Sequence, residues 1–338
     1  MQAVPAADGT TGGAAPPVLS VHGLGVEFAS ARGAVRAVDG LSMQVARGEV
    51  FAIVGESGSG KSSVALAVTG LLPPSARVEG EVRLLGRDVM RMPAAERRRM
   101  AGEQAGLVCQ DALSSLNPCT TVGFQIAETL MVHRGMAKRA AMQDAVRLLK
   151  LTGVPAPEER VHDYPHQFSG GMRQRALIAI ALALDPALLI ADEPTTALDA
   201  TIKAQILDLL LRLRRDLGMS IVIITHDMGV VAKLADRMLV MYAGRAIEVG
   251  RVEEIFARPA HPYTRALLDA VPRLGRGAKD LQPIPGAPPS MQALPPGCAF
   301  HPRCPLALPR CQAEAPALVP TGAARQAACH LAIAGAAA

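Results

Sequence analysis

The 338-residue sequence contains no tryptophan and only three Tyr and six Phe residues. Proteins that bind single-stranded nucleic acid stack bases on aromatic side chains lying among basic residues, and no such stripe is present. The formal net charge of +5 is modest for this length, and we interpret the basic run 97–99 as a solvated helix face. We therefore expect no nucleic-acid partner.

Long hydrophobic runs are also missing, although half of the residues are hydrophobic. The longest apolar stretch, residues 176–191, is interrupted by Asp185 and Pro186. Each remaining piece is shorter than the roughly 20 apolar residues that a spanning helix needs. The first 17 residues have no basic start and no apolar stretch before their Gly and Pro residues, so they lack the layout of a secretory signal. These absences predict a cytosolic chain without membrane spans.

The order of apolar patterns predicts an α/β fold. Residues 1–17 are rich in Ala, Gly and Pro and are expected to form a disordered tail. Short half-buried strands separated by Gly-containing turns are expected over residues 19–45. Strands that alternate with helices imply a mostly parallel sheet covered on both faces. The main elements expected are strands at 50–54, 187–191 and 220–224 and helices at about 61–72 and 199–217.

Two further regions differ from this α/β pattern. Residues 117–168 have little strand character, and the segments 123–133 and 138–151 carry apolar residues at helical spacing. They predict an inserted helical subdomain, placed at about residues 117–184. From Pro259 the chain is rich in Pro and holds four of the six Cys residues. We therefore expect a core domain over residues 18–258 and a C-terminal extension over residues 259–338.

The strongest motif is the Gly-rich segment that joins the strand 50–54 to the helix after it. The order Gly, four residues, Gly, Lys and Ser is that of a phosphate-binding loop. Its glycines let backbone amides point at phosphate oxygens near the positive end of a helix. Lys61 is expected to reach the β and γ phosphates, and Ser62 to bind Mg²⁺. The nucleotide-binding residues expected here are Gly55, Glu56, Ser57, Gly58, Ser59, Gly60, Lys61, Ser62 and Ser63.

Two adjacent carboxylates, Asp192 and Glu193, follow the strand 187–191. Asp192 is placed to hold Mg²⁺ through water, and Glu193 to orient and polarise the attacking water. Capping of the next helix is the alternative role for this pair. A phosphate loop alone fits kinases, GTPases, helicases and transport ATPases. The absence of a guanine-reading Asn-Lys-x-Asp motif makes the GTPase class less suitable.

A third motif, Ser169-Gly170-Gly171, opens an expected helix and offers a hydroxyl and backbone amides at its positive end. Together with the phosphate loop and Asp192-Glu193, it resembles the signature of the ABC ATPase family, and the resemblance covers roughly residues 19–257. It implies a P-loop NTPase core with an antiparallel β subdomain, the inserted helical subdomain and a cysteine-containing tail, and it implies ATP and Mg²⁺ as cofactors. ATP would lie between two chains arranged head to tail, with Ser169, Gly170 and Gly171 facing the partner's nucleotide.

Other positions match the family one at a time. Gln110 resembles the loop glutamine that touches Mg²⁺ and links nucleotide state to the membrane partner. Asp199 resembles the aspartate that communicates between the two ATP sites. His226 resembles the histidine that contacts the γ phosphate, and Phe28 the aromatic residue that stacks on adenine. The catalytic residues that the resemblance implies are Glu193, His226, Gln110 and Lys61.

A closer resemblance is to the ATPases of oligopeptide and dipeptide importers, carried also by the segments 115–118, 241–245 and 261–264. It implies ATP-driven uptake of peptides by a peripheral subunit on the cytoplasmic face of the inner membrane. The implied partners are a second ATPase chain, commonly a related paralogue, two transmembrane permease subunits and an external solute-binding protein. Uptake of nickel or another small solute is an alternative, and a non-transport ABC ATPase is a further one. Cys109 and Ala112 depart from the importer pattern.

Four cysteines lie in the Pro-rich extension. Clustered cysteines in a cytosolic chain indicate metal or redox chemistry rather than disulfides. Their spacing does not match the paired knuckles of a zinc ribbon, and spacing alone leaves free thiols and a metal site equally open. In peptide-importer ATPases a tail resembling residues 297–304 carries an iron–sulfur cluster. The resemblance therefore implies a 4Fe–4S cluster held by Cys298, Cys304, Cys311 and Cys329.

Overall fold

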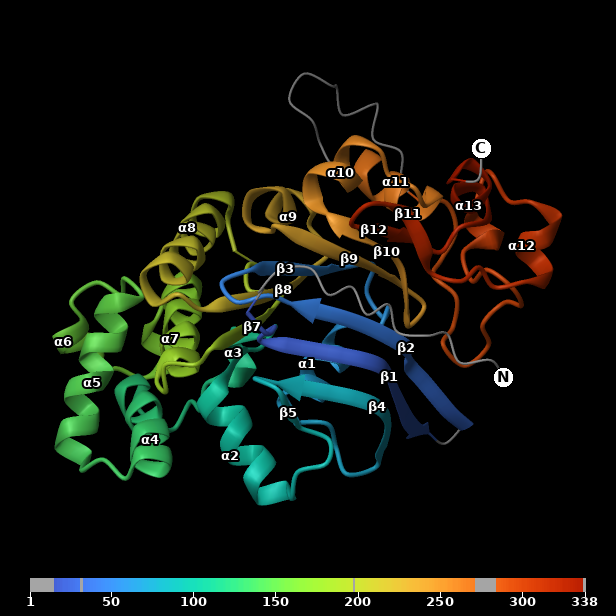
Figure 1. The fold of residues 1–338 in the computed structure, drawn as a ribbon. Coiled ribbons are helices and arrows are strands. Elements are labelled where there is room, and N and C mark those ends of the chain that lie inside the picture. Colours follow the sequence, from blue (N-terminus) through green and yellow to red (C-terminus); the bar gives the residue numbers. More distant parts are fainter. Residues whose placement is uncertain (1–14, 31–32, 197, 271–283, 337–338) are drawn as a thin grey trace.

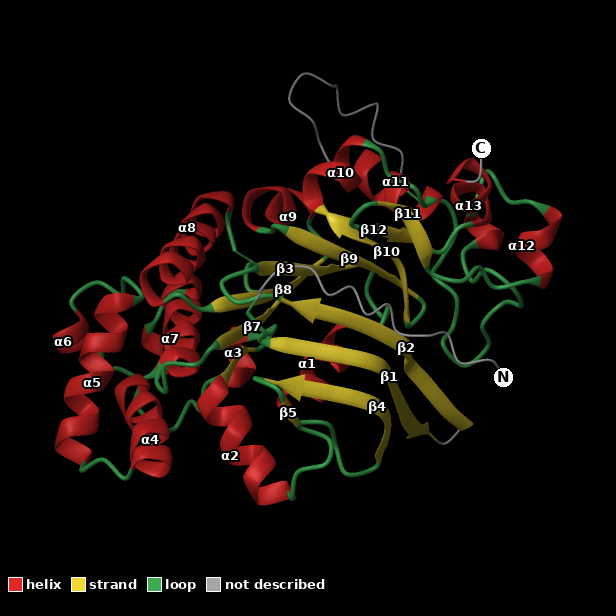
Figure 2. Cartoon of the chain, in the orientation of Figure 1, coloured by secondary structure: helices red, strands yellow, loops and turns green. Residues whose placement is uncertain are grey.

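The computed structural model describes residues 15–30, 33–196, 198–270 and 284–336, and it arranges them as two sheets with helices around them (Figures 1 and 2). Residues 1–14 of the expected disordered tail lie outside the described residues. Among the helices described, none combines the length and the apolar character needed to cross a bilayer.

A four-stranded antiparallel sheet, in the order β2-β1-β4-β5, lies at the N-terminal end of the chain. Alternate residues of β1, such as Leu19 and Val21, are completely buried, as period-2 patterning requires of a sheet with one covered face. The strands expected over residues 19–45 are therefore confirmed. The strands of this sheet are β1 (Leu19–Ser30), β2 (Gly33–Val45), β4 (Ala76–Leu84) and β5 (Arg87–Asp88).

The main sheet has eight strands in the order β11-β12-β10-β9-β3-β8-β7-β6. The strands β9, β3, β8, β7 and β6 are parallel, so the mostly parallel sheet predicted from the sequence is confirmed. Residues of β3, β7 and β8 are buried throughout, which explains their unbroken apolar runs. The strands are β3 (Val50–Val54), β6 (Ala105–Val108), β7 (Leu188–Asp192), β8 (Ser220–Thr225), β9 (Arg237–Tyr242), β10 (Arg245–Arg251), β11 (Val319–Gly322) and β12 (Arg325–Ala327).

Helices cover the main sheet, and a group of them forms the predicted helical region at one side of the molecule (Figure 1). The helices expected at 123–133 and 138–151 are present as α4 and α5, which pack against each other and against α7. The helices around the sheet are α1 (Lys61–Thr69), α2 (Ala94–Gln104), α8 (Ala200–Leu217), α9 (Met228–Leu234) and α10 (Val252–Ala257). The helical region contains α3 (Ala112–Ser115), α4 (Val122–Arg134), α5 (Lys138–Leu151), α6 (Pro157–Arg160), the 3₁₀ turn η1 (Pro165–Gln167) and α7 (Gly170–Leu182).

The C-terminal extension returns to the main sheet. Its strand β12 pairs antiparallel with β10, with Glu248 opposite Ala327. The carboxylate of Glu248 is completely buried and accepts hydrogen bonds from Arg325 and from the amides of Ala260 and His261. The other elements of the extension are α11 (Pro262–Asp269), the 3₁₀ turn η3 (His301–Arg303), α12 (Pro309–Ala313) and α13 (His330–Ala336).

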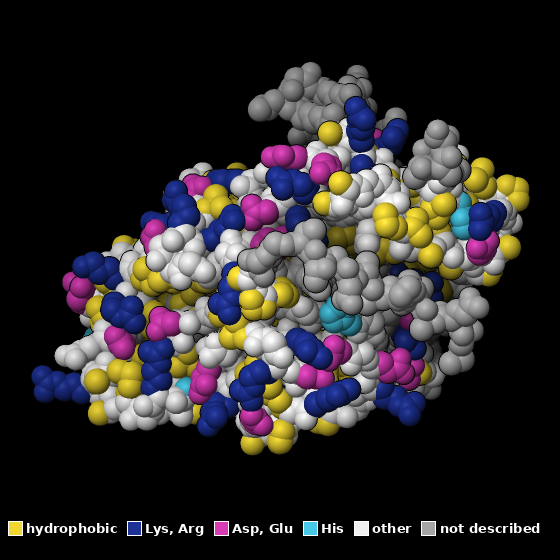
Figure 3. Space-filling model, in the orientation of Figure 1, with side chains coloured by type: hydrophobic (Ala, Val, Ile, Leu, Met, Phe, Trp, Pro, Cys, Tyr) yellow, Lys and Arg dark blue, Asp and Glu magenta, His cyan; other side chains and the backbone are white. Residues whose placement is uncertain are grey.

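The face of the molecule in Figure 3 carries charges of both signs. Lys and Arg side chains alternate with Asp and Glu side chains over the sheets and helices, and hydrophobic side chains gather over the C-terminal elements at the upper right. This pattern on the visible face differs from the single basic stripe that nucleic-acid binding uses.

Candidate active site

The Gly-rich segment forms a tight loop between β3 and α1. A Cβ atom on Gly55 would lie 2.3 Å from the carbonyl oxygen of Met241, and one on Gly60 would lie 2.1 Å from that of Ala37. Both residues have positive φ angles, 157° and 101°. Only glycine fits these two positions, and the backbone therefore passes close to its neighbours in the conformation that a phosphate loop needs.

Lys61 lies at the start of α1, and its side chain folds back over the loop. Its ammonium group donates to the carbonyl oxygens of Gly55 and Glu56, both at 2.8 Å. Burial lowers the pKa of Lys61, while the nearby carboxylates of Glu193, Asp192 and Glu56 act in the opposite direction. Within the loop, Ser57, Gly58 and Ser62 are exposed, Glu56, Gly60 and Ser63 are half-buried and Ser59 is buried.

Asp192 ends β7 beside the start of α1. Burial raises its pKa, and a hydrogen bond with Ser62 acts against this rise. Its Oδ1 atom is buried and has no hydrogen-bond partner among the described residues. A buried carboxylate oxygen without a partner is a suitable ligand for a hard cation. The predicted pair Ser62 and Asp192 is thus brought together, and its chemistry fits Mg²⁺.

Glu193, the next residue, is the centre of a hydrogen-bond network. Its Oε1 lies 3.1 Å from Nδ1 of His226, and its Oε2 accepts from Nε2 of Gln110 at 3.1 Å and from the Thr196 hydroxyl at 2.9 Å. The backbone is held at a φ of 48°, and its amide donates to the carbonyl of Ile224. Burial acts to raise the pKa of Glu193, but the hydrogen bonds from His226 and Thr196 outweigh it and the pKa is lowered. The carboxylate is therefore ionised and oriented at neutral pH.

The topology explains how these side chains meet. Gln110 follows β6, Glu193 follows β7 and His226 follows β8. These three parallel strands are neighbours in the sheet, so their carboxyl ends, where α/β proteins bind ligands, lie side by side. The four catalytic residues expected from the sequence therefore gather at one edge, because Lys61 follows β3 at the same edge.

The Ser-Gly-Gly motif lies at the first turn of α7. The Ser169 hydroxyl caps the helix by accepting from the amide of Met172 at 3.4 Å, and both Ser169 and Gly170 are exposed. A Cβ atom on Gly171 would lie 2.7 Å from Ile202 of α8. The motif thus packs against the start of α8 and leaves a hydroxyl and amides facing outward.

Two other expected site residues, Asp199 and Phe28, make no hydrogen bond or ion pair with Glu193 among the described residues. Asp199 caps α8 by accepting from the amide of Ile202 at 2.9 Å, a local role that any helix-capping aspartate performs. Phe28 lies in β1 and is partly buried against the core that the antiparallel sheet forms with α1. No hydrogen bond or ring contact described for these two residues links them to the phosphate loop, so their nucleotide contacts stay predictions.

The four tail cysteines line one small cavity of about 20 Å³. The backbone joins two of them, since the amide of Cys298 donates to the carbonyl of Cys311 at 2.8 Å. Burial raises the pKa of the Cys298 thiol, and the other three thiols raise it slightly further. However, the described residues contain no group of three or more His, Cys, Asp or Glu side chains arranged to hold a metal ion. The expected cluster is therefore not confirmed by the structure.

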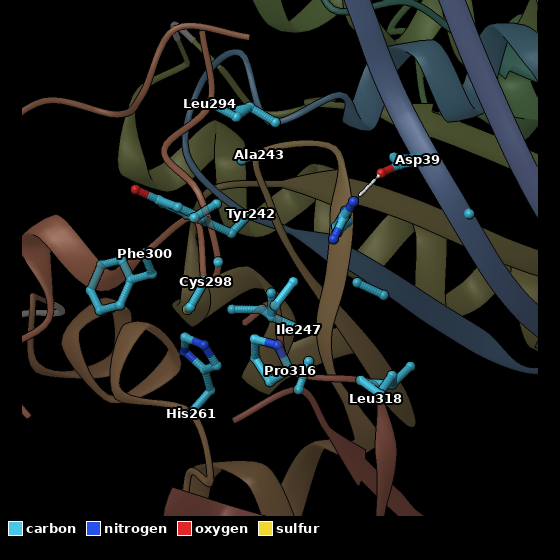
Figure 4. A pocket seen from close by; sticks show the side chains of 18 of the residues that line it. Asp39, Tyr242, Ala243, Ile247, His261, Leu294, Cys298, Phe300, Pro316 and Leu318 are labelled. Carbon is cyan, nitrogen blue, oxygen red and sulfur yellow. Dashed lines mark hydrogen bonds and ion pairs between the residues drawn. The ribbon is translucent and has the colours of Figure 1, made fainter. Parts of the chain in front are cut away.

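A second and larger pocket, about 780 Å³, lies between the main sheet and the extension (Figure 4). Tyr242, His261, Cys298 and Phe300 lie on one wall, and Asp39 of β2 lies across from them with an ion pair to Arg245. The pocket is lined by none of the phosphate-loop residues. The predicted site at the strand ends therefore lies outside this pocket.

Sequence reasoning missed three residues that touch the predicted site. Thr196 follows Glu193 by three positions and donates to it, and a hydroxyl so near the predicted catalytic carboxylate is a signal that the sequence contains. Tyr263 accepts a hydrogen bond from the amide of Glu56 at 2.9 Å. Arg303 forms a two-pronged ion pair with the Glu56 carboxylate. No local sequence pattern links either of these tail residues to a loop more than 200 positions away.

Two family models match the chain. The model described as ABC transporter covers residues 38–196, which include the phosphate loop, the Ser-Gly-Gly motif and the acidic pair. The model described as Oligopeptide/dipeptide transporter, C-terminal region covers residues 247–311. The second match takes in α11, η3 and three of the four tail cysteines.

Curated relatives match over most of the chain. The dipeptide transport ATP-binding protein DppD of Bacillus subtilis is 50% identical over 85% of this chain and 87% of its own length. The corresponding DppD of Escherichia coli is 48% identical over 93% and 96%. The oligopeptide transport ATP-binding protein OppD of Salmonella typhimurium is 48% identical over 88% and 89%.

A solved structure shares the fold. It is the dimeric post-hydrolysis state of the ATP-binding cassette MJ0796 bound to ADP and phosphate. The TM-score is 0.63 at 27% identity, and the match covers 69% of this chain and 98% of that one.

Proposed function

Because this chain belongs to the ABC transporter family, as an ATP-binding subunit of the dipeptide and oligopeptide type, we propose that it is the motor subunit of a peptide importer. It is an ATPase, and the proposal concerns what ATP hydrolysis drives. The observation that carries the proposal is the extent of the match, which spans nearly the whole of the E. coli dipeptide subunit and includes the C-terminal region of peptide transporters.

We propose a role for each group of the site. The loop amides and Lys61 bind the phosphates, and Ser62 and Asp192, with Gln110, would hold Mg²⁺. That ion supplies charge neutralisation on the phosphate oxygens. Glu193 orients the attacking water through a carboxylate oxygen and accepts its proton as the water oxygen bonds to the γ phosphorus. The bond between that phosphorus and the bridging oxygen breaks, and ADP leaves with that oxygen. His226, Gln110 and Thr196 hold that carboxylate in one orientation.

The exposed motif at the start of α7 supports a two-chain ATP site. We propose that Ser169, Gly170 and Gly171 face the nucleotide of a second ATPase chain, a related paralogue, in a head-to-tail pair, and that Asp199 and Phe28 act at the same sites. Ser169 and Gly170 are exposed and lie at a helix N-terminus, where amides attract anions. The solved cassette that shares this fold is a dimer bound to ADP and phosphate.

The remaining partners follow from the importer proposal. Two transmembrane permease subunits would carry the spans, an external solute-binding protein would deliver the peptide, and this chain would sit on the cytoplasmic face of the membrane. The names of the relatives favour peptides over nickel or another small solute. They also favour transport over a non-transport ABC ATPase.

Replacing Ser169 with arginine in the reconstituted complex should abolish ATP-driven uptake of a labelled dipeptide into proteoliposomes, because the larger cation would fill the space for the partner's nucleotide. The isolated variant should still bind ATP, since Ser169 makes no contact with Lys61 in the phosphate loop of its own chain. Uptake and ATP binding are measured on the same preparations. A variant that transports as well as the unchanged complex would contradict the two-chain site, and an unchanged complex that hydrolyses ATP without taking up peptide would contradict the importer function.

The tail cysteines carry a separate proposal, a 4Fe–4S cluster held by Cys298, Cys304, Cys311 and Cys329. Four thiols around one cavity are the donor set that such a cluster uses. A cavity of about 20 Å³ holds little more than one water molecule, so the segments that carry the thiols must separate for the cluster to enter.

Protein purified without oxygen should be brown and should contain iron and acid-labile sulfide in equal amounts. Changing Cys311 to serine should remove both, since a cluster needs its thiolate ligands. The exposed Cys119, which lies in the helical region, provides the matched control, and its serine variant should keep the colour. If the protein instead contains stoichiometric zinc and no sulfide, the cysteines form a zinc site. If it contains neither iron nor zinc, they are free thiols.

A further inference from the structure

The Arg303 side chain connects the cysteine-bearing tail to the phosphate loop. Arg303 ends the 3₁₀ turn η3 and stands between Cys298 and Cys304 in the sequence. Its guanidinium donates twice to the Glu56 carboxylate, from Nη1 to Oε2 at 2.7 Å and from Nη2 to Oε1 at 3.0 Å. Glu56 is the second residue of the loop and lies 247 positions away in the sequence.

The guanidinium is fixed on its other sides as well. Its Nε donates to the carbonyl of Pro285 at 2.9 Å, and Nη1 also reaches the Tyr242 hydroxyl at 3.3 Å. The rings of Tyr242 and Phe300 each lie 5.9 Å from its central carbon. Figure 4 shows these two rings beside Cys298 at one wall of the large pocket. Since the guanidinium is a planar fork, these contacts leave it a single orientation toward Glu56.

The backbone of Glu56 is held from both sides. Its amide donates to the hydroxyl of Tyr263, a fully buried residue whose ring packs on Tyr242 and Phe300. Its carbonyl accepts from the Lys61 ammonium at 2.8 Å. The tail therefore holds the carboxylate and the amide of Glu56. The carbonyl of the same residue accepts a hydrogen bond from Lys61.

This ion pair differs from those on the surface. The Arg303 side chain is 5% exposed and that of Glu56 is 25% exposed. Exposed pairs contribute little because water and salt screen them, whereas removing one partner of a buried pair leaves an uncompensated charge. Removing the Arg303 guanidinium should therefore leave the Glu56 carboxylate without its partner and alter the conformation of the phosphate loop.

We propose that Arg303 is a positioning residue for the phosphate loop, through which the cysteine-bearing tail supports the ATP site. It holds Glu56 so that the loop backbone and Lys61 are arranged before the nucleotide arrives. A preorganised loop binds more tightly because less order must be created on binding. The inference rests on the ATPase function described above and does not depend on which solute is carried.

The test uses the full-length chain and the variants Arg303→Ala, Arg303→Lys, Glu56→Gln and the double variant with Arg303→Ala and Glu56→Gln. Loss of charge-assisted hydrogen bonds predicts that Arg303→Ala raises the Kd for ATP and the KM about tenfold. The kcat at saturating ATP should change much less, because Arg303 touches neither Glu193 nor Lys61. Lysine should restore part of the affinity, and the double variant should lose no more than the stronger single variant.

Arg310→Ala is the matched control. Arg310 makes the same two-pronged contact, with Glu314 at 2.7 and 2.9 Å, in the same tail, but its side chain is 61% exposed. Its removal should leave the Kd and KM unchanged. If Arg303→Ala lowers the melting temperature yet binds ATP as tightly as the unchanged chain, Arg303 only anchors the tail and the proposal is wrong. If Arg303→Ala raises the Kd and KM as expected but the unchanged complex takes up no peptide, the importer function is wrong and the role of Arg303 stands.

Discussion

Replacing Glu193 with glutamine should reduce steady-state ATP hydrolysis by at least about 100-fold, the lower range for a general base, while ATP still binds. The amide keeps the shape of the carboxylate but cannot accept a proton or polarise water comparably. In the structure the carboxylate lies within hydrogen-bond distance of His226, Gln110 and Thr196. The measurement is phosphate release at saturating ATP together with equilibrium binding of ATP.

Glu49 provides a control for this experiment. Its side chain is 8% exposed, like that of Glu193, and it pairs with Arg237. It precedes β3 and so lies at the opposite end of that strand from the phosphate loop. Glu49→Gln should hydrolyse ATP at a rate close to that of the unchanged chain. If the Glu193 variant hydrolyses ATP at a near-normal rate, Glu193 is not a catalytic residue.

Replacing Lys61 with alanine should weaken ATP binding itself by roughly 10- to 100-fold, which is the loss expected for a hydrogen bond to a charged group. The variant loses the ammonium nearest the transferring phosphate. It also loses the two hydrogen bonds that the ammonium donates to the carbonyls of Gly55 and Glu56, so the loop backbone is held less firmly. Titration of the variant with ATP in the presence of Mg²⁺ measures the Kd.

Lys233→Ala is the corresponding control, because Lys233 of α9 pairs with Asp208 at 2.7 Å on the outer helices. Its Kd for ATP should equal that of the unchanged chain. An unchanged Kd for the Lys61 variant would count against the assigned phosphate loop. A variant that binds ATP normally but fails to hydrolyse it would place Lys61 in catalysis alone.

The α/β core could be predicted because its strands are buried on both faces. Such strands read as unbroken apolar runs, and the residues after them, Asp192, Glu193 and His226, could be assigned from position. The strand order could not be predicted, since it arises from long-range pairing of parallel strands. The meeting of Gln110 with Glu193 depends on that order, because it places β6 beside β7.

Two strands of the antiparallel sheet, β4 and β5, were not identified from the sequence. Residues 76–84 alternate small or apolar residues with charged ones, and only Val82 and Leu84 are fully buried. Such a segment gives a weak strand signal, because its outer face is largely solvated. The short strand β6 was missed for a different reason, since four residues give too little pattern to distinguish a strand from a loop.

The contacts that Tyr263 and Arg303 make with Glu56 could not be predicted from the sequence. Glu56 was predicted to belong to the nucleotide site because of its place in the loop, but its carboxylate meets Arg303. The clustered cysteines indicate a metal or redox site, but no sequence pattern marks Arg303, the residue before Cys304, as part of the nucleotide site. Contacts between segments so distant in sequence depend on the complete fold.

The pairing of β12 with β10 has a consequence for any attempt to study the ATPase part alone. A chain cut after residue 258 would lack β11 and β12, and β10 would become an exposed edge with unpaired amides and carbonyls. Such an edge is a template for strand addition and aggregation. The buried Glu248 carboxylate would also lose Arg325 and the amides of Ala260 and His261. We therefore expect a shortened chain to aggregate unless another strand covers β10 and another cation pairs with Glu248.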